Sequence, residues 1–168
     1  MSNAVATKST LYAVKGGTSQ PKGKWYTEDE IDNLIIDEYK KFKASLDREE
    51  RDFFNHNLNM AKSGCEELFF SLKTLSKIDC KKIHLRVTSK QSFDAIVEIP
   101  FKNYISDGFN IAFNKSQEIA NRLNNSKFFI EYTFMPSSRS INRDLLISDG
   151  YFQTYKPKNV NKTSTRKA

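Results

Sequence analysis

Residues 47–75, DREERDFFNHNLNMAKSGCEELFFSLKTL, contain the longest apolar face in the chain. Seven residues share this face because they recur at alternating spacings of four and three: Phe54, Leu58, Ala61, Cys65, Leu68, Leu72 and Leu75. Asp47, followed three residues later by Glu50, is typical of a capping box at a helix start. The pattern predicts a helix of about seven turns at the centre of the core.

A second helical pattern precedes this one, over residues 27–46. Thr27 and Glu30 have the spacing of a capping box, and apolar residues then follow helical spacing as far as Leu46. The cap signal at Asp47 favours a break near residues 45–47, and therefore a helical hairpin. One unbroken helix over residues 27–76 is the alternative, because neither Gly nor Pro stands between the two patterns.

From Lys82 onward the apolar period changes to two, which is typical of strands. Residues 82–88 and 93–99 alternate on either side of a polar turn at 89–92, and this predicts a β-hairpin with one buried face. Four further elements are expected after it: a helix over about 107–123, a strand over 128–135, a short helix through Leu145 and Leu146, and a strand over 151–155.

These elements predict an α+β fold in two layers, with an N-terminal helical hairpin packed on a mainly antiparallel sheet of three to five strands. Residues 11–15 form a strand-like island that would add a strand before the helices. The order would then be that of a ferredoxin-like fold with one extra helix and strand. A fold of this kind supports many functions, so it names none.

The net charge of +7 is concentrated at the two ends of the chain. Nine basic residues lie in residues 1–26 and 156–168, which contain no acid: Lys8, Lys15, Lys22, Lys24, Lys156, Lys158, Lys162, Arg166 and Lys167. Subtracting these nine from 27 leaves 18 basic against 20 acidic residues in the middle. We therefore expect one domain over residues 27–155 between an extended basic arm (1–26) and a flexible basic tail (156–168).

The composition indicates a soluble protein of a reducing compartment. Two cysteines, Cys65 and Cys80, are too few for a disulfide framework. No apolar run is long enough for a signal peptide or a membrane span. We expect a cytoplasmic protein, or one within an intracellularly assembled particle, with no membrane contact.

The strongest catalytic candidates are polar residues of the predicted strands. His84, Asp94, Glu98 and Glu131 would share the face opposite the apolar side chains, where they would bind a divalent metal for phosphodiester cleavage. The favoured alternative is a solvated face on which Arg86 pairs with Asp94 or Glu98. Lysines beside Cys80 would lower its pKa, but no base is fixed beside it, so a bystander thiol is favoured.

No cofactor or metal site is expected. The sequence has no phosphate-binding loop, dinucleotide fingerprint or zinc spacing. Arg139 and Arg143, with the serines at 137–140, stand before the short helix and would hold a phosphate. The favoured alternative is a polar loop in which Ser140 caps that helix.

The sequence favours a non-enzymatic binding or structural subunit of a larger assembly, such as a protein complex, virion or nucleoprotein particle, anchored by its basic arms. The alternatives are a nucleic-acid-binding accessory protein that acts through the arms, and the metal-dependent nuclease. The expected partners are other protein subunits, with nucleic acid and a second copy of the chain as further candidates. Phe53, Phe69 and Phe70 lie off the strict apolar face of residues 47–75, and they are the predicted interface if the sheet does not cover them.

Overall fold

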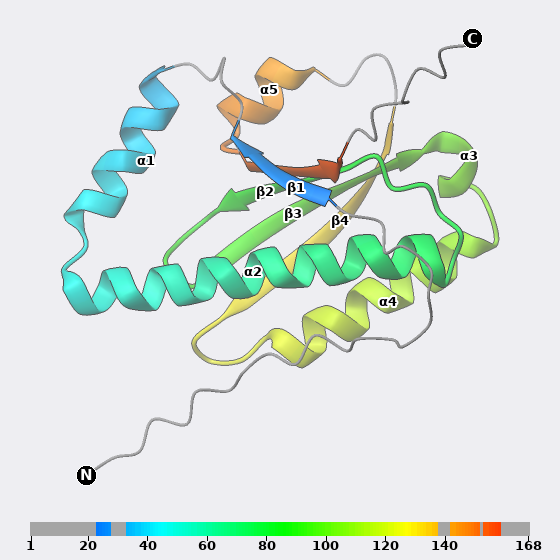
Figure 1. The fold of residues 1–168 in the computed structure, drawn as a ribbon, viewed down its shortest axis with the longest axis horizontal. Helices are drawn as coiled ribbons and strands as arrows, with labels where there is room; N and C mark the ends of the chain where they lie inside the picture. The colour runs from blue at the N-terminus through cyan, green and yellow to red at the C-terminus, as the bar shows by residue number, and fades with distance from the viewer. Residues whose placement is uncertain (1–22, 28–32, 138–141, 152, 159–168) are drawn as a thin grey trace, which may run out of the picture.

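The computed structural model describes residues 23–27, 33–137, 142–151 and 153–158, and they form a two-layer α+β domain (Figure 1). The elements are β1 (Gly23–Thr27), α1 (Asn33–Ser45), α2 (Arg48–Thr74), β2 (Lys82–Val87), β3 (Ser92–Pro100), α3 (Phe101–Tyr104), α4 (Gly108–Leu123), β4 (Phe129–Ser137), α5 (Arg143–Ser148) and β5 (Gln153–Pro157). The predicted fold class is confirmed, and so are the hairpin of β2 and β3 and the helix α4.

The five strands form one mixed sheet in the order β1-β5-β2-β3-β4. Neighbouring strands are antiparallel except β3 and β4, which are parallel and joined through α3 and α4. These two strands are direct neighbours, whereas a ferredoxin-like fold separates the strands of its crossover unit. The ferredoxin-like alternative therefore does not describe this sheet, and residues 11–15, on which it depended, lie outside the described residues.

The break between the two N-terminal helices occurs where the second cap signal predicts it. Asp47 accepts a hydrogen bond from the Glu50 backbone N–H at 2.8 Å, and the Glu50 carboxylate accepts one from the Asp47 N–H at 3.3 Å. This reciprocal capping box satisfies backbone donors that a helix start leaves unpaired. The two helices touch beside the break, where Tyr39 and Phe42 pack on Phe54.

The predicted cap at Thr27 is wrong. Thr27 is the last residue of β1 and pairs with Gln153 of β5, while α1 begins at Asn33. Strand β1 also takes in residues 23–26 of the expected arm, and β5 extends to Pro157 in the expected tail. Trp25 and Tyr155 explain this extension, because their rings pack together at 5.4 Å on the core side of the sheet.

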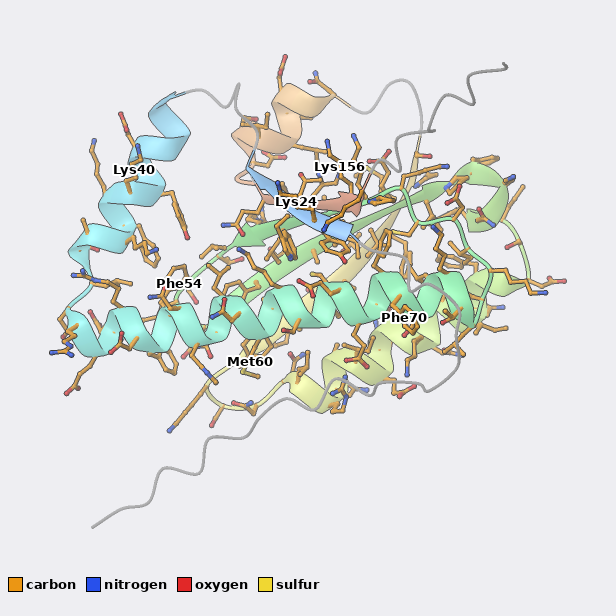
Figure 2. All side chains as sticks on the ribbon, viewed as in Figure 1. Lys24, Lys40, Phe54, Met60, Phe70 and Lys156 are labelled. Carbon is orange, nitrogen blue, oxygen red and sulfur yellow. The ribbon has the colours of Figure 1, made fainter. Side chains whose placement is uncertain are left out.

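Helix α2 lies across one face of the sheet with α4 beside it (Figure 1). Six of the seven residues of its predicted face are buried; Phe54, labelled in Figure 2, is among them, and Leu75 at the helix end is exposed. Gly64 faces α4 and β4. A Cβ at this position would lie 2.5 Å from the Tyr132 hydroxyl and 2.8 Å from a methyl group of Leu123. The missing side chain therefore lets the helix and the strand approach α2 closely.

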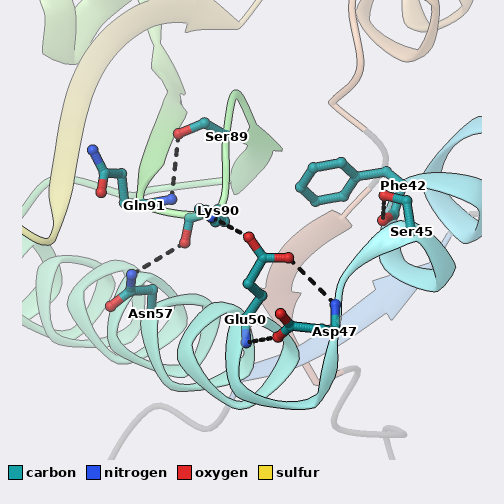
Figure 3. A network of polar contacts seen from close by, with 8 residues as sticks. All are labelled: Phe42, Ser45, Asp47, Glu50, Asn57, Ser89, Lys90 and Gln91. Atoms are coloured by element: carbon teal, nitrogen blue, oxygen red, sulfur yellow. Dashed lines mark hydrogen bonds and ion pairs between the residues drawn. The ribbon is translucent and has the colours of Figure 1, made fainter.

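Asn57 fastens two turns to α2. It is 2% exposed, and its side-chain N–H₂ group donates to the carbonyl oxygens of Lys90 at 3.1 Å and Lys127 at 3.0 Å. Lys90 also pairs with Glu50 at 2.6 Å, so the capping carboxylate holds the β2–β3 turn as well (Figure 3). These contacts fix one end of the sheet against the start of α2.

Trp25 fixes β1 to the helical layer. Its indole N–H donates to Glu66 of α2 at 2.9 Å, and the Lys62 ammonium lies 5.4 Å from the centre of its ring. Burial lowers the pKa of the Lys62 amine. Among the helices that the structure describes, none combines the length and the apolar character needed to cross a membrane.

Candidate functional site

The predicted polar face of the sheet exists, but its four candidate residues do not form one site. His84 lies close to Glu98, whereas Asp94 pairs with Arg86. Glu131 is exposed and stands opposite Asp94 in the β3–β4 register. Within the described ranges, no group of three His, Cys, Asp or Glu side chains is placed to hold a metal ion.

His84 connects two strands through both of its ring nitrogens. Its Nδ1 lies 3.1 Å from the Thr154 hydroxyl of β5, and its Nε2 lies 3.1 Å from the Glu98 carboxylate of β3. The hydrogen bond from His84 lowers the pKa of Glu98, against the opposing effect of burial. These contacts form a connected series that runs from the Thr154 hydroxyl through the His84 imidazole to the Glu98 carboxylate.

This order is that of a nucleophile, its base and an orienting acid. Thr154 is 1% exposed and His84 is 7% exposed, so a substrate does not reach the hydroxyl. A buried polar group needs such partners simply to offset its lost hydration. We therefore interpret the Thr154–His84–Glu98 chain as a structural connection between β5, β2 and β3.

Arg86 neutralises the charge of the Asp94 carboxylate. Its guanidinium donates twice to the Asp94 carboxylate and once to the carbonyl oxygen of Asp149, and it lies 4.8 Å from the centre of the Tyr151 ring. The hydrogen bond to Asp94 raises the pKa of Arg86. The favoured interpretation of this face predicted that Arg86 pairs with Asp94 or Glu98, and the observed ion pair is the one with Asp94. The pair also joins the sheet to the end of α5.

The two cysteines are not arranged as nucleophiles. Cys65 and Cys80 are buried free thiols, and burial raises the pKa of both. The sequence suggested that lysines would lower the pKa of Cys80; desolvation outweighs them. Both thiols therefore behave as small apolar core side chains.

The predicted phosphate-binding residues fall into two groups. Lys24, Lys156 and Lys158 are described, and Lys24 stands opposite Lys156 in the β1–β5 register. Asn142, not Ser140, caps α5, accepting from the Leu145 N–H at 3.1 Å. The structure does not describe the other predicted residues, or only the backbone in the case of Arg143: Lys8, Lys15, Lys22, Arg139, Lys162, Arg166 and Lys167.

The three predicted interface phenylalanines are covered to different degrees. Phe69 is buried and packs edge-on against Tyr155 at 5.1 Å, so the sheet takes this side chain. Phe53 and Phe70 are half-buried on α2. Each therefore exposes a smaller fraction of its side chain than Leu75 or Phe101 does.

Six large apolar side chains are exposed around the end of α2, α3 and the start of α4. We call this set the apolar end: Leu75, Phe101, Tyr104, Ile105, Ile111 and Phe113. Ile105 is 68% exposed and Leu75 is 62% exposed; outside this set, the exposed large apolar residues of the described chain are Leu145 at 60% and Phe129 at 47%. The three segments meet at the same end of the domain (Figure 1), where the Ser76 carbonyl oxygen faces Gly108.

Aromatic packing connects two members of the apolar end, Tyr104 and Phe113, through Phe109. Tyr104 packs on Phe109 at 4.8 Å, and Phe109 in turn contacts Phe113 at 6.3 Å and Phe134 of β4 at 5.3 Å. The exposed rings are therefore held by the core beneath them. Sequence reasoning missed this surface; the available signal was Ile111, which lies off the inward face of α4.

Three exposed basic side chains are close neighbours, along the chain, of apolar-end residues, and we call them the rim. Lys73 and Lys77 flank Leu75 in the chain, and Lys102 follows Phe101; all three are exposed. The nearby acid Asp79 already pairs with Lys81. Asp107 is the remaining acid of this surface, so the described rim carries a net positive charge.

Comparisons with models of known protein families, with curated proteins and with solved structures found no match to this chain.

Proposed function

We propose that this protein is a non-enzymatic binding subunit of a larger assembly and that its apolar end docks onto another protein. The observation that carries the proposal is the gathering of six exposed apolar side chains on one end of the domain. Large exposed apolar patches rimmed by polar residues are typical of interaction sites on soluble domains. Aromatic residues such as Phe101, Tyr104 and Phe113 are enriched at protein interfaces.

The rim defines the chemistry of the partner. Lys73, Lys77 and Lys102 would face carboxylates on a complementary surface, which would give both orientation and faster association. A second copy of this chain would bring the same positive rim against itself, and like charges at an interface are unfavourable. The proposed partner is therefore a different protein with an apolar centre and an acidic surround.

An enzymatic role has less support. Glu98 and Asp94 are held by His84 and Arg86, and the Thr154 hydroxyl is buried. The basic arms fit a binding subunit better than an enzyme, because an arm that becomes ordered on a neighbouring molecule adds binding contacts. Two buried free thiols fit a reducing compartment, so we place the assembly in the cytoplasm or in a particle formed there.

The test begins with purification of the native complex and identification of the protein that travels with the chain. Binding of that purified partner is then measured for the wild type, for a Phe101→Ser/Ile105→Ser variant and for a Leu145→Ser control. We expect the double variant to lose at least about tenfold in affinity, because each anchor contributes on the order of 1 kcal/mol. The control removes an equally exposed apolar residue outside the apolar end and should bind as the wild type does.

Zero-length cross-linking of lysine amines to carboxylates tests the rim in the same complex. We expect Lys73, Lys77 and Lys102 to be joined to Asp or Glu of the partner, and Lys40 of α1 to remain unlinked. Cross-links between two copies of this chain at the rim would overturn the choice of partner. Equal affinity of the double variant and the wild type would overturn the docking site.

A further inference from the structure

Strand β4 forms one edge of the sheet (Figure 1) and, within the described ranges, pairs only with β3. Sheet edges are commonly protected by a lysine, by a bulge or by a very short strand. Strand β4 is nine residues long, keeps an unbroken register with β3 from Phe129 to Ser137 and contains no lysine. An edge of this kind is suited to pairing with a further strand.

The backbone groups of β4 point alternately toward β3 and outward. The Phe129 N–H donates to the carbonyl oxygen of Gln91, the residue before β3, at 2.8 Å. The next residue, Ile130, points outward. There the Asn124 side chain accepts from the Ile130 N–H at 2.7 Å and donates to the Ile130 carbonyl oxygen at 3.0 Å. Asn124 therefore bonds to the edge at Ile130 as a neighbouring strand would.

Beyond Ile130 the unpaired part of the edge is short. The same alternation turns the backbone groups of Tyr132 and Phe134 outward, and no described residue bonds to them on that side. Pro136, the next outward residue, has no N–H to donate. We call the outward N–H and C=O groups of Tyr132 and Phe134 the open edge. It is bounded by Asn124 at one end and by Pro136 at the other.

We propose that the open edge pairs with the open edge of a second copy of this chain, antiparallel and about a two-fold axis at Thr133. In this register Tyr132 of each copy stands opposite Phe134 of the other. Both residues point their backbone groups outward, so each pair exchanges both of its N–H···O=C bonds. The pairing therefore satisfies every group of the open edge in both copies.

The two ends of the open edge select this register. With the axis at Thr133, Pro136 of one copy stands opposite Ile130 of the other. Pro136 lacks an N–H, and the groups of Ile130 are already bonded to Asn124, so the ladder ends without an unpaired donor. Moving the axis back by one residue would instead place Phe134 opposite Ile130, where Asn124 already holds both backbone groups.

The side chains on the exposed face fit the same axis. Thr133 is exposed and meets Thr133 of the second copy, and Thr–Thr pairs across antiparallel strands are favourable. Glu131 stands opposite Met135 of the second copy, so the two carboxylates are not directly opposite one another. A longer unrelated strand would meet the Asn124 amide and the proline ring, whereas the chain's own edge matches both. The partner that fits this edge is therefore a second copy.

This pairing is independent of docking through the apolar end. Phe101, an apolar-end residue, follows Pro100, which pairs with Ser137 at the C-terminal end of β4. Antiparallel pairing places the C-terminal ends of the two β4 strands on opposite sides of the axis, so the two apolar ends lie apart. The dimer would join two five-stranded sheets into one continuous sheet and would present two apolar ends to other proteins.

A cysteine at the axis tests the register in the full chain. Opposite residues of a non-hydrogen-bonded antiparallel pair have Cα atoms about 4.5 Å apart, which a disulfide can bridge. Thr133→Cys is oxidised with copper phenanthroline, and the dimer is quantified on a non-reducing gel. The matched control is Glu131→Cys, which is exposed on the same face. Its two copies would stand about 13 Å apart along the ladder.

We expect Thr133→Cys to form the disulfide-linked dimer roughly tenfold or more faster than Glu131→Cys, because the pairing holds the two thiols together at high effective concentration. The native cysteines, Cys65 and Cys80, are buried and are common to both variants. Equal rates in the two variants would indicate random collision and would overturn the register.

Sedimentation velocity provides a second measurement that needs no added cysteine. Up to about 100 μM, where micromolar dissociation constants are detected, we expect the wild type to form a dimer and Thr133→Lys to stay monomeric. The lysines would stand opposite one another at the axis, and like charges there oppose pairing. Asn59→Lys adds the same charge to an exposed position of α2 and should form the dimer. Circular dichroism confirms that each variant is folded.

Two outcomes of the sedimentation experiment would contradict the proposal. A wild type that stays monomeric over the whole concentration range would overturn the pairing. A Thr133→Lys variant that forms a dimer as readily as the wild type would overturn the open edge as its site. Either result leaves docking through the apolar end standing, because that surface is tested by different variants and a different partner.

Discussion

Gly64 of α2 and Tyr132 of β4 lie so close together that a side chain at position 64 has no space. A methyl group at position 64 would meet the Tyr132 hydroxyl at 2.5 Å, and burial, which raises the pKa of Tyr132, leaves that side chain little room to move. We predict that Gly64→Ala lowers the free energy of unfolding by about 1–2 kcal/mol, because the overpacking cost exceeds the gain in helix propensity. Urea unfolding of the purified variant measures this change.

Tyr132→Phe provides the matched background for this prediction. The Tyr132 hydroxyl is buried without a hydrogen-bond partner among the described residues, so its removal costs little. In the Tyr132→Phe background we expect Gly64→Ala to lose about half or less of its penalty. Equal penalties in the two backgrounds would show that Leu123, and not the hydroxyl, limits the space.

Glu98 makes the stability of the fold depend on pH. Its pKa lies below the ordinary value of 4.5 because His84 donates to the carboxylate. A lowered folded-state pKa means that the contribution is complete above about pH 4.5 and is lost as the pH falls through the folded-state value. We predict that Glu98→Gln flattens the dependence of the unfolding free energy on pH below 4.5.

The control for Glu98 is Glu131→Gln, which removes an exposed carboxylate from the same face. This variant should keep the acid dependence of the wild type. Chemical unfolding at several pH values between about 3 and 7 provides the comparison, within the range in which carboxylates titrate. Parallel curves for Glu98→Gln and the wild type would contradict the prediction.

Sequence alternation correctly placed His84, Asp94 and Glu98 on one face and anticipated the Arg86–Asp94 pair. It did not anticipate the bond between His84 and Thr154, because Thr154 reaches His84 through the pairing of β5 with β2. Alternation predicts which face of the sheet a side chain lies on. It does not predict which strand, distant in the sequence, pairs beside it and supplies its hydrogen-bond partner.

At the scale of elements, Asn57 holds two turns on one helix. The β2–β3 turn and the α4–β4 turn each offer it a carbonyl oxygen, at Lys90 and Lys127. We predict that Asn57→Ala lowers the free energy of unfolding by about 1–3 kcal/mol, because the two acceptors lose their partner. Faster hydrogen exchange at the Phe129 N–H, which bonds to Gln91 between the turns, should accompany this loss.

Asn59→Ala is the control, since Asn59 is exposed on the same helix and gains the same helix propensity. It should leave unfolding unchanged or slightly stabilise the protein. A similar response of the two variants would mean that the Asn57 hydrogen bonds contribute nothing measurable.

Elements with strong local signals were predicted well. The break between α1 and α2 follows from the capping box at Asp47, and the β2–β3 hairpin follows from its period of two. Strand β1 was missed because residues 23–27 are a short segment that begins with Gly23 and Lys24, and only its pairing with β5 makes it a strand. Its stability comes from Trp25 and Tyr155, which are brought together by the fold.

At the scale of the whole molecule, Trp25 is the chain's single tryptophan and therefore reports the docking of β1. Its contacts with Glu66 and Tyr155 tie β1 to both layers. We predict that unfolding followed by tryptophan fluorescence and by far-UV circular dichroism gives the same midpoint, as expected for one cooperative unit. A fluorescence transition at lower denaturant would show that β1 separates from the sheet before the domain unfolds.

The apolar end could not be predicted from the sequence because it is a property of the assembled domain. Leu75 ends the apolar pattern of residues 47–75 and was expected to be buried, yet it is the C-cap that follows the last turn of α2 and is exposed. Phe101 is the first residue of α3 and Ile105 follows its last residue. No periodic pattern in the sequence predicted this short helix. Three unrelated segments produce this surface only when the crossover from β3 to β4 brings them to one end.

The pairing of β1 with β5 also sets an order in time. The first and last strands of the domain are neighbours, so this ladder cannot form on the ribosome until the end of the domain has emerged. Closing so long a loop is also among the slower steps of folding. A nascent chain would therefore present the apolar end while the ladder between β1 and β5 is still unformed.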